Sequence, residues 1–239
     1  MFRLIYCIFW LVIFFFPIAL LSVIPPRRRR KASLFIYRCL ARIFRINITI
    51  RGELTTKEPV LFVSNHMSYA DIIVLGATLP GNFISKAEVK KWPLFGWIAQ
   101  LTGTVFVSRK KAGTMNQLSD IETAINNGKN LILFPEGTTS DGKAVMPFKS
   151  SLFKIVETRD ITVQPVTLSY THINGLPLQA NERVKIAWVG DAELMPHLRE
   201  FVNLGMIRAE VKIHEPLHVK GDRKLVADEA QKIVADWKS

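Results

Sequence analysis

From about Ile46 onward, short apolar runs alternate with stretches whose apolar residues recur at helical spacing. Uncharged runs such as Val60–Ser64 and Leu131–Phe134 are typical of strands that are covered on both faces. The pattern predicts one α/β domain over residues 46–239, with a mixed, largely parallel sheet flanked by helices. The predicted strands are Ile46–Ile50, Val60–Ser64, Val105–Ser108, Leu131–Phe134, Thr162–Leu168, Val184–Val189 and Ala209–Ile213. The predicted helices are Asp71–Leu79, Ala87–Leu101, Thr114–Asn127, Ser150–Thr158, Pro196–Asn203 and Asp222–Trp237, the last docking through Leu225, Val226, Ile233, Val234 and Trp237.

The amino-terminal segment has a different pattern. Leu4–Ile24 is a run of 21 residues without a charge, and a helix of that length spans ~30 Å, the thickness of a bilayer core. Pro25 and Pro26 are expected to end this helix, and the basic block Arg27–Lys31 follows at once. Such a block resists translocation and binds anionic lipids, so we expect residues 1–45 to form a membrane anchor and the remainder to lie on the cytoplasmic side.

Two other interpretations of this segment fit its apolar character less directly. A cleaved signal peptide would have its positive charges before the apolar run, but only Arg3 stands there. A kink at Pro17, together with an amphipathic stretch over Ser33–Phe44 that lies flat in the interface, would instead give a monotopic anchor of two helices. The sequence leaves open the choice between a single span and this anchor.

The positive net charge favours anionic binding partners. The chain has 32 Lys and Arg against 20 Asp and Glu, a formal net charge of +12, which favours anionic lipid surfaces, phosphorylated substrates, acidic carrier proteins or nucleic acid. A nucleic-acid binder is not favoured, because much of the excess charge lies in one block beside an apolar run and no nucleic-acid motif occurs. The two cysteines and five histidines lack the spacing of a metal site, so no metal or cofactor is expected.

A first candidate site lies in Asn65–Asp71, directly after a predicted buried strand. His66 and Asp71 are five residues apart, which in a continuous helix would turn them about 500° and onto different faces. They can meet if His66 lies in the loop and Asp71 in the first turn of the next helix. Asp71 would then fix the imidazole tautomer and leave the other ring nitrogen free as a base. Ser68 and Asp71 also have the spacing of a capping box, so a purely structural role for Asp71 remains an alternative.

A second candidate site is Phe134–Ser140, which again leaves an apolar strand and enters a polar loop. Gly137 would allow close approach of a ligand to the backbone, and Glu136 with the neighbouring hydroxyls could hold a polar headgroup. Gly137–Lys143 also approximates the phosphate loop of nucleotide hydrolases. However, Ala144 follows where a Ser or Thr is required, and Pro147 would break the helix beyond.

Together these motifs resemble the glycerolipid acyltransferase family. Its first motif, N-H-x-x-x-x-D, is matched by Asn65, His66 and Asp71, and its third, F-P-E-G-T, by Phe134–Thr138. The fourth, a proline within a strand, is matched around Pro165. The second motif is matched by Lys86, Pro93, Gly96, Gly103 and Arg109. The stretches TTSDG, PFKSSLF, AWVGD and MPHL look more like lyso-ornithine lipid acyltransferases than phosphatidate-forming enzymes.

The resemblance implies a fold and an activity. The fold would be glycerolipid acyltransferase-like with an amino-terminal membrane-anchoring helical segment. The protein would lie at a membrane, and the compact length of the chain indicates a bacterial inner membrane. The enzyme would transfer an acyl chain from acyl-CoA or acyl-carrier protein to the hydroxyl of a lysolipid, most simply 1-acylglycerol-3-phosphate, with lyso-ornithine lipid or another lysophospholipid as the alternative acceptor. A non-catalytic lipid-binding protein on the same fold is the alternative from another class. The implied catalytic residues are His66 and Asp71, and the implied substrate-binding residues are Asn65, Lys86, Arg109, Glu136, Gly137 and Thr138.

Overall fold

A single mixed sheet forms the centre of the molecule in the computed structural model, which describes residues 26–92, 95–107, 114–190, 192–218 and 221–236. The strand order is β1-β8-β6-β2-β5-β3-β4, and the short β7 pairs with β6 outside this order. Neighbouring strands from β6 to β4 run parallel, whereas β8 is antiparallel to β6 and parallel to β1. The predicted mixed, largely parallel α/β sheet is therefore confirmed. The strands are β1 Ile46–Arg51, β2 Val60–Ser64, β3 Asn82–Lys86, β4 Val105–Val107, β5 Leu131–Leu133, β6 Thr162–Ile173, β7 Leu176–Pro177 and β8 Ile207–Ile213.

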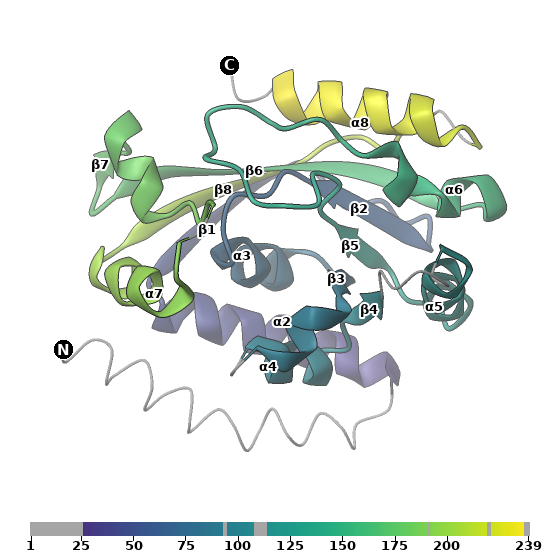
Figure 1. Cartoon of the computed structure of the whole chain (residues 1–239), viewed down its shortest axis with the longest axis horizontal. Helices are drawn as coiled ribbons and strands as arrows, with labels where there is room; N and C mark the ends of the chain where they lie inside the picture. The colour runs from purple at the N-terminus through teal and green to yellow at the C-terminus, as the bar shows by residue number, and fades with distance from the viewer. Residues whose placement is uncertain (1–25, 93–94, 108–113, 191, 219–220, 237–239) are drawn as a thin grey trace.

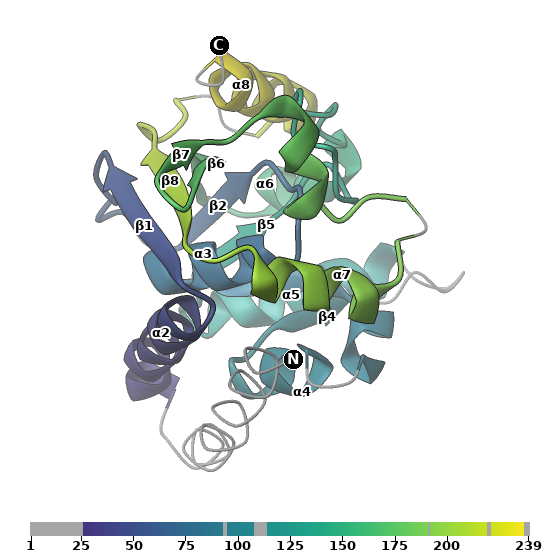
Figure 2. The same cartoon turned by 90° about the vertical axis from the view of Figure 1, so that its left-hand side faces the viewer.

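Helices cover both faces of this sheet (Figure 1). α8 lies over one face with α6, while α2, α3 and α7 lie over the other, as the turned view in Figure 2 also shows. The helices are α2 Pro26–Ile43, α3 Ala70–Thr78, α4 Phe95–Leu101, α5 Thr114–Asn126, α6 Ile155–Thr158, α7 Leu194–Asn203 and α8 Arg223–Asp236, with the 3₁₀ turns η2 Ala87–Lys91, η3 Ser150–Phe153 and η4 Ala180–Lys185.

The alternating side chains of β2 enter two different cores. Leu61 and Val63 pack with the side chains of α5, α6 and α8, whereas Val60 and Phe62 pack with those of α2, α3 and α7. All five residues of β2 are buried, which explains why the run carries no charge. The polar residues that follow β2 therefore leave a rigid strand at the middle of the sheet, where their positions are well determined.

The amphipathic stretch before the sheet packs on the domain. α2 begins at Pro26, a favourable first position for proline, and its apolar residues Ile36 and Leu40 are buried on the side of α3. Arg42 and Phe35 are exposed, Phe35 at 61%, and the exposed Arg38 donates its Nε–H to the carbonyl of Ala77 on α3 at 3.2 Å. The apolar face of Ser33–Phe44 thus packs on the core of the domain, largely against α3.

The apolar run Leu4–Ile24, predicted to anchor the chain, lies outside the described residues. Within the described part of the chain, no helix combines the length and apolar character that crossing a bilayer requires. Residue 109, assigned to the second motif, and Pro93 also lie outside the described residues.

Three element predictions were wrong. Val184–Val189 is not a strand: η4 occupies its start, with a capping box between Gln179 and Glu182, and Val184 is 63% exposed. The predicted helix Ala87–Leu101 is divided into η2 and α4, because Trp92 between them has extended backbone, and the predicted helix Ser150–Thr158 is divided into η3 and α6. The strand β3 was missed altogether.

The carboxyl-terminal helix docks largely through the predicted face, with Ile233 also packed against the core, but Leu225 is turned away from it. Val226 and Val234 are buried as expected, together with Ala227 and Ala230, but Leu225 is 55% exposed. The true buried face includes small residues, which a search for large apolar side chains overlooks. Trp237 lies outside the described residues.

Candidate active site

His66 leaves the carboxyl end of β2 in a loop that a buried amide fixes in place. The side chain of Asn65 donates to the carbonyl of Leu168 on β6 and accepts from the backbone N–H of Leu168, each at 2.9 Å. Asn65 is 1% exposed. This burial points to a structural role in joining β2 to β6, rather than the substrate-binding role that the resemblance implied.

Asp71 lies in the first turn of α3, as the spacing predicted, and its buried carboxylate is surrounded by donors. Oδ2 is 2.8 Å from Nδ1 of His66, and it accepts the backbone N–H groups of Met67 at 2.7 Å and Ser68 at 2.9 Å. Oδ1 accepts the hydroxyl of Tyr170 at 2.9 Å. Asp71 therefore holds the turn that leads into α3 and binds the imidazole at the same time, although the N-cap of α3 is Tyr69, which makes no side-chain capping bond.

These donors determine the tautomer of His66. Two backbone N–H groups already point at Oδ2, which identifies it as an acceptor, so Nδ1 must carry the proton that it donates. The neutral ring then has an unprotonated Nε2, and none of the described residues bonds to that atom. The side chain of His66 is 17% exposed, enough for one edge of the ring to reach solvent or substrate. A base with this tautomer can take a proton at Nε2 while Asp71 stabilises the charge that forms.

The imidazole plane is held by stacking on Phe134. The two ring centroids are 3.9 Å apart with an interplanar angle of 13°. Phe134 follows β5, the strand beside β2, and stacks in turn on Phe83 of β3 at 6.0 Å. Adjacent strands thus fix both the edge and the plane of the ring.

Glu136 ties the two candidate sites together through its buried carboxylate. Oε1 accepts the backbone N–H of His66 at 2.7 Å, and Oε2 accepts the backbone N–H of Met146 at 3.2 Å. Glu136 is 0% exposed. It therefore positions the histidine loop, and its burial does not favour the direct contact with substrate that the resemblance implied.

Replacing Glu136 tests this positioning role. In Glu136→Gln, the amide NH₂ must face one of the two backbone N–H groups, which leaves a buried donor without an acceptor. We expect the free energy of unfolding to fall by about 1–3 kcal/mol, with a loss of activity smaller than that of any change at His66. Thermal unfolding and steady-state rates measure the two effects. Glu200→Gln, at an exposed position on α7, is the control, and an equal stability for both variants would contradict the assignment.

The loop after Glu136 packs on the histidine loop. Ser140 donates both its backbone N–H and its hydroxyl to the carbonyl of His66, at 2.9 and 3.1 Å. Thr139 donates its hydroxyl to the carbonyl of Trp188, whose own N–H donates to Met67 at 2.8 Å. The three segments form one hydrogen-bonded unit, from which the side chain of Thr138 points outward as an exposed hydroxyl.

Gly137 has a positive φ of 70°, a backbone conformation that disfavours other residues. A Cβ at this position would lie 3.0 Å from Nζ of Lys149, whose exposed side chain crosses the glycine. Among the described residues, Lys149 has no carboxylate partner, so a cation stands beside the loop that the resemblance assigned to acceptor binding. The sequence analysis did not single out Lys149.

Lys86 lies at the carboxyl end of β3, exposed and at the same edge of the sheet as His66. Two strand spacings separate β3 from β2, or roughly 10 Å. The structure thus brings Lys86 to the edge where His66, Glu136 and Gly137 gather. Arg109, the predicted partner of an anionic headgroup, falls outside the described residues.

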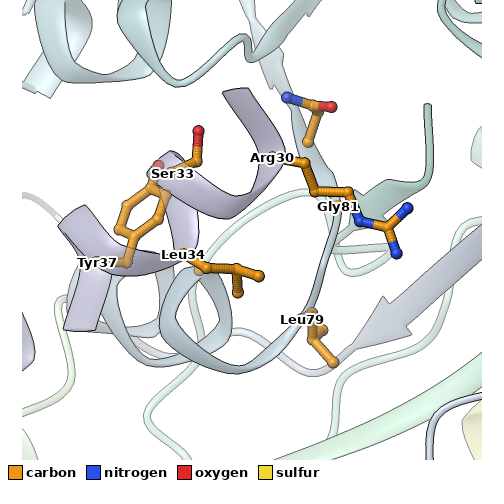
Figure 3. A pocket seen from close by; sticks show the side chains of 8 residues that line it. Arg30, Ser33, Leu34, Tyr37, Leu79 and Gly81 are labelled. Carbon is orange, nitrogen blue, oxygen red and sulfur yellow. The ribbon is translucent and has the colours of Figure 1, made fainter. Parts of the chain in front are cut away.

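A small pocket at the other end of α3 is separate from this site (Figure 3). It is lined by Arg30, Ser33, Leu34, Tyr37, Gly76, Leu79, Gly81 and Asn82. α3 has nine residues, so its two ends are roughly 13 Å apart. Arg30 is paired with Glu58 at 2.6 Å, and Tyr37 of the pocket packs edge-on against Phe83, whose ring stacks on Phe134.

Tyr170 is the functional residue that the sequence analysis missed most clearly. Its hydroxyl reaches Asp71 from β6, although the two residues are 99 positions apart. Burial first, and then the charge of Asp71, raise the pKa of Tyr170 well above its ordinary value. The only signal in the sequence was that Tyr170 follows the predicted proline-containing strand by two residues. That position does not say toward which residue its ring points.

The fold and the site define a class of protein: an α/β domain with a histidine–aspartate pair at the carboxyl edge of its parallel strands, the edge at which such sheets place their active sites. A model of the family described as Acyltransferase matches residues 45–169, and the chain belongs to the acyltransferase family.

Its relatives include several acyltransferases whose names state an acceptor lipid. The chain is similar to the lyso-ornithine lipid O-acyltransferase of Brucella abortus, 41% identical over 209 residues, which cover 83% of this chain and 78% of that protein. It is also similar to the 1-acyl-sn-glycerol-3-phosphate acyltransferase of Neisseria meningitidis, 32% identical over 148 residues, which cover 61% of this chain and 58% of that protein. Among solved structures, the acyltransferase PlsC of Thermotoga maritima shares the fold, with a TM-score of 0.66 and 21% identity over 100% of this chain and 95% of that one.

Proposed function

We propose that this protein transfers a fatty acyl chain from a thioester donor to the free hydroxyl of a lysolipid, with Nε2 of His66 as the general base. The observation that carries the proposal is the 2.8 Å bond between Nδ1 and Asp71, which leaves Nε2 as the unprotonated nitrogen at the carboxyl edge of the sheet. A non-catalytic lipid-binding protein would have no need for a buried carboxylate that fixes an imidazole tautomer. The chemistry therefore favours catalysis over simple binding.

The thioester is already activated, so the alcohol is the partner that needs help. Nε2 removes the hydroxyl proton as the oxygen attacks the thioester carbonyl carbon, and Asp71 stabilises the imidazolium. The tetrahedral intermediate then collapses, the carbon–sulfur bond breaks, and the imidazolium returns its proton to the departing thiolate. The products are an ester and a free thiol, and no covalent bond to the enzyme is formed.

For the acceptor we favour lyso-ornithine lipid over 1-acylglycerol-3-phosphate, which the sequence analysis had placed first. Support comes from four relatives named as lyso-ornithine lipid O-acyltransferases, which are 33% to 41% identical to the chain. Relatives named for 1-acylglycerol-3-phosphate match with 31% or 32% identity. Acyl-CoA and acyl-carrier protein are both proposed donors, since each presents the same thioester to the site.

We propose that the enzyme works at the cytoplasmic face of a bacterial inner membrane. The apolar run over residues 4–24 and the exposed arginines Arg38 and Arg42 on α2 support attachment to an anionic lipid surface. The relatives from Brucella and Neisseria come from bacteria.

The acceptor assignment is tested by incubating the purified full-length protein in mixed vesicles with a labelled acyl donor. Lyso-ornithine lipid and 1-acylglycerol-3-phosphate are supplied in parallel, each with acyl-CoA and with acyl-carrier protein. We expect kcat/KM to be at least tenfold higher with lyso-ornithine lipid. Transfer to 1-acylglycerol-3-phosphate alone would overturn the acceptor assignment, and no transfer to either, with binding of both, would favour the non-catalytic lipid-binding alternative.

A further inference from the structure

The two oxygens of the Asp71 carboxylate have unequal surroundings. Oδ2 has three donors, namely the His66 ring and two backbone N–H groups. Within the described part of the chain, Oδ1 is bonded by one group alone, the hydroxyl of Tyr170 at 2.9 Å. Asp71 is 0% exposed, so water does not readily replace that donor. Tyr170 thus supplies the hydrogen bond that holds Oδ1 in place.

The position of the Tyr170 hydroxyl is set by the sheet. Tyr170 lies on β6 opposite Ala209 of β8, and the pairing shifts register just beyond it, between Tyr170 and His172. The ring is buried in the core with α3 and α7 at 6% exposure. A strand in the middle of the sheet holds this ring, so the hydroxyl cannot follow a carboxylate that rotates away.

We propose that Tyr170 is a positioning residue for acyl transfer, which locks the rotation of the Asp71 carboxylate so that Oδ2 faces Nδ1 of His66. This inference rests on the proposed function, because it assigns Tyr170 a role in the same base-catalysed step. Tyr170 acts through Asp71 and lies behind it, remote from the substrate. Its removal therefore lowers kcat and leaves the KM values for donor and acceptor nearly unchanged.

The variant Tyr170→Phe keeps the ring and removes only the hydroxyl. Tyr37→Phe is a matched control, because Tyr37 is also fully buried with one side-chain partner, the hydroxyl of Thr102 at 3.0 Å, and burial raises its pKa to about 12. We expect kcat of Tyr170→Phe to fall by ~10- to 100-fold, the effect of losing one hydrogen bond to a charged group. The KM values should change less than twofold, and Tyr37→Phe should keep the wild-type kcat.

A structural contribution of the hydroxyl is separated from positioning by two further measurements. The thermal unfolding midpoint should fall in both variants, and further in Tyr170→Phe because its lost bond is to a charged group, but both proteins should stay folded at the assay temperature while only Tyr170→Phe loses activity. In an Asp71→Asn background, Tyr170→Phe should cause less than a twofold further loss in single-turnover rate, because the carboxylate through which it acts is gone.

Equal kcat values for Tyr170→Phe and Tyr37→Phe would overturn the inference, and so would a full second loss in the Asp71→Asn background. The wild-type protein is assayed beside them with both lysolipids. If it transfers no acyl group, the proposed function fails; if it does so while Tyr170→Phe is equally active, only the role of Tyr170 fails.

Discussion

His66→Ala is expected to lower acyl transfer by at least ~10²–10⁴-fold, the usual contribution of a general base. The substitution removes the nitrogen that takes the hydroxyl proton. It should leave the fold intact, because the loop is held by contacts that do not involve the ring: the backbone N–H of His66 still bonds to Glu136, and its carbonyl still accepts from Ser140. Initial rates with saturating donor and acceptor give the measurement.

His172→Ala is the matched control for this variant. His172 is a partly buried histidine on β6 whose ring contacts the hydroxyl of its neighbour Thr171. We expect it to retain wild-type activity, and both variants to keep the wild-type circular dichroism spectrum and vesicle binding. If His66→Ala keeps more than a few per cent of the rate, a base at this position is excluded.

Asp71→Asn is expected to reduce kcat/KM by ~10²–10⁴-fold, in the range found for aspartate in hydrolase triads. Three donors converge on Oδ2, so the amide oxygen should take that place and the NH₂ should point to the oxygen of Tyr170. The tautomer of His66 is then kept, and the loss isolates the negative charge that stabilises the imidazolium. Stability should fall only slightly, because the amide oxygen still accepts the backbone N–H groups of Met67 and Ser68, in the turn that leads into α3.

Asp222→Asn provides the comparison. Asp222 precedes α8 and accepts the backbone N–H groups of Lys224 and Leu225 at 2.7 and 3.2 Å, but it has no histidine partner. Paired kinetic and thermal measurements separate the two functions of Asp71. If Asp71→Asn lowers only the unfolding temperature and keeps the wild-type rate, as Asp222→Asn should, the role of Asp71 is structural and not catalytic.

Much of the sheet could be predicted from the sequence because its central strands are buried on both faces. β2 and β5 stand out as uncharged runs, and the edge strand β1 is rich in β-branched residues. β3, with the sequence NFISK, was missed because only Phe83 of its five residues is buried, so the strand carries no recognisable alternation. Its pairing with β4 and β5 depends on residues far along the chain.

The candidate site was predictable to the extent that its geometry is local. His66 and Asp71 are close in sequence, and the turn between a strand and a helix brings them together. The burial of Asn65 and Glu136 was not predictable, because it depends on how the loops from β2, β5 and β6 pack on one another. Tyr170 could be assigned only after the β2–β6 register was known, since that register places it beside Asp71.

The packing of α2 has a mechanical consequence for the reaction. α2 is packed against α3, and α3 begins one residue before Asp71, so a movement of α2 reaches the dyad through a pair of rigid helices. Because Asp71 binds the ring of His66, such a movement would also shift the position of Nε2.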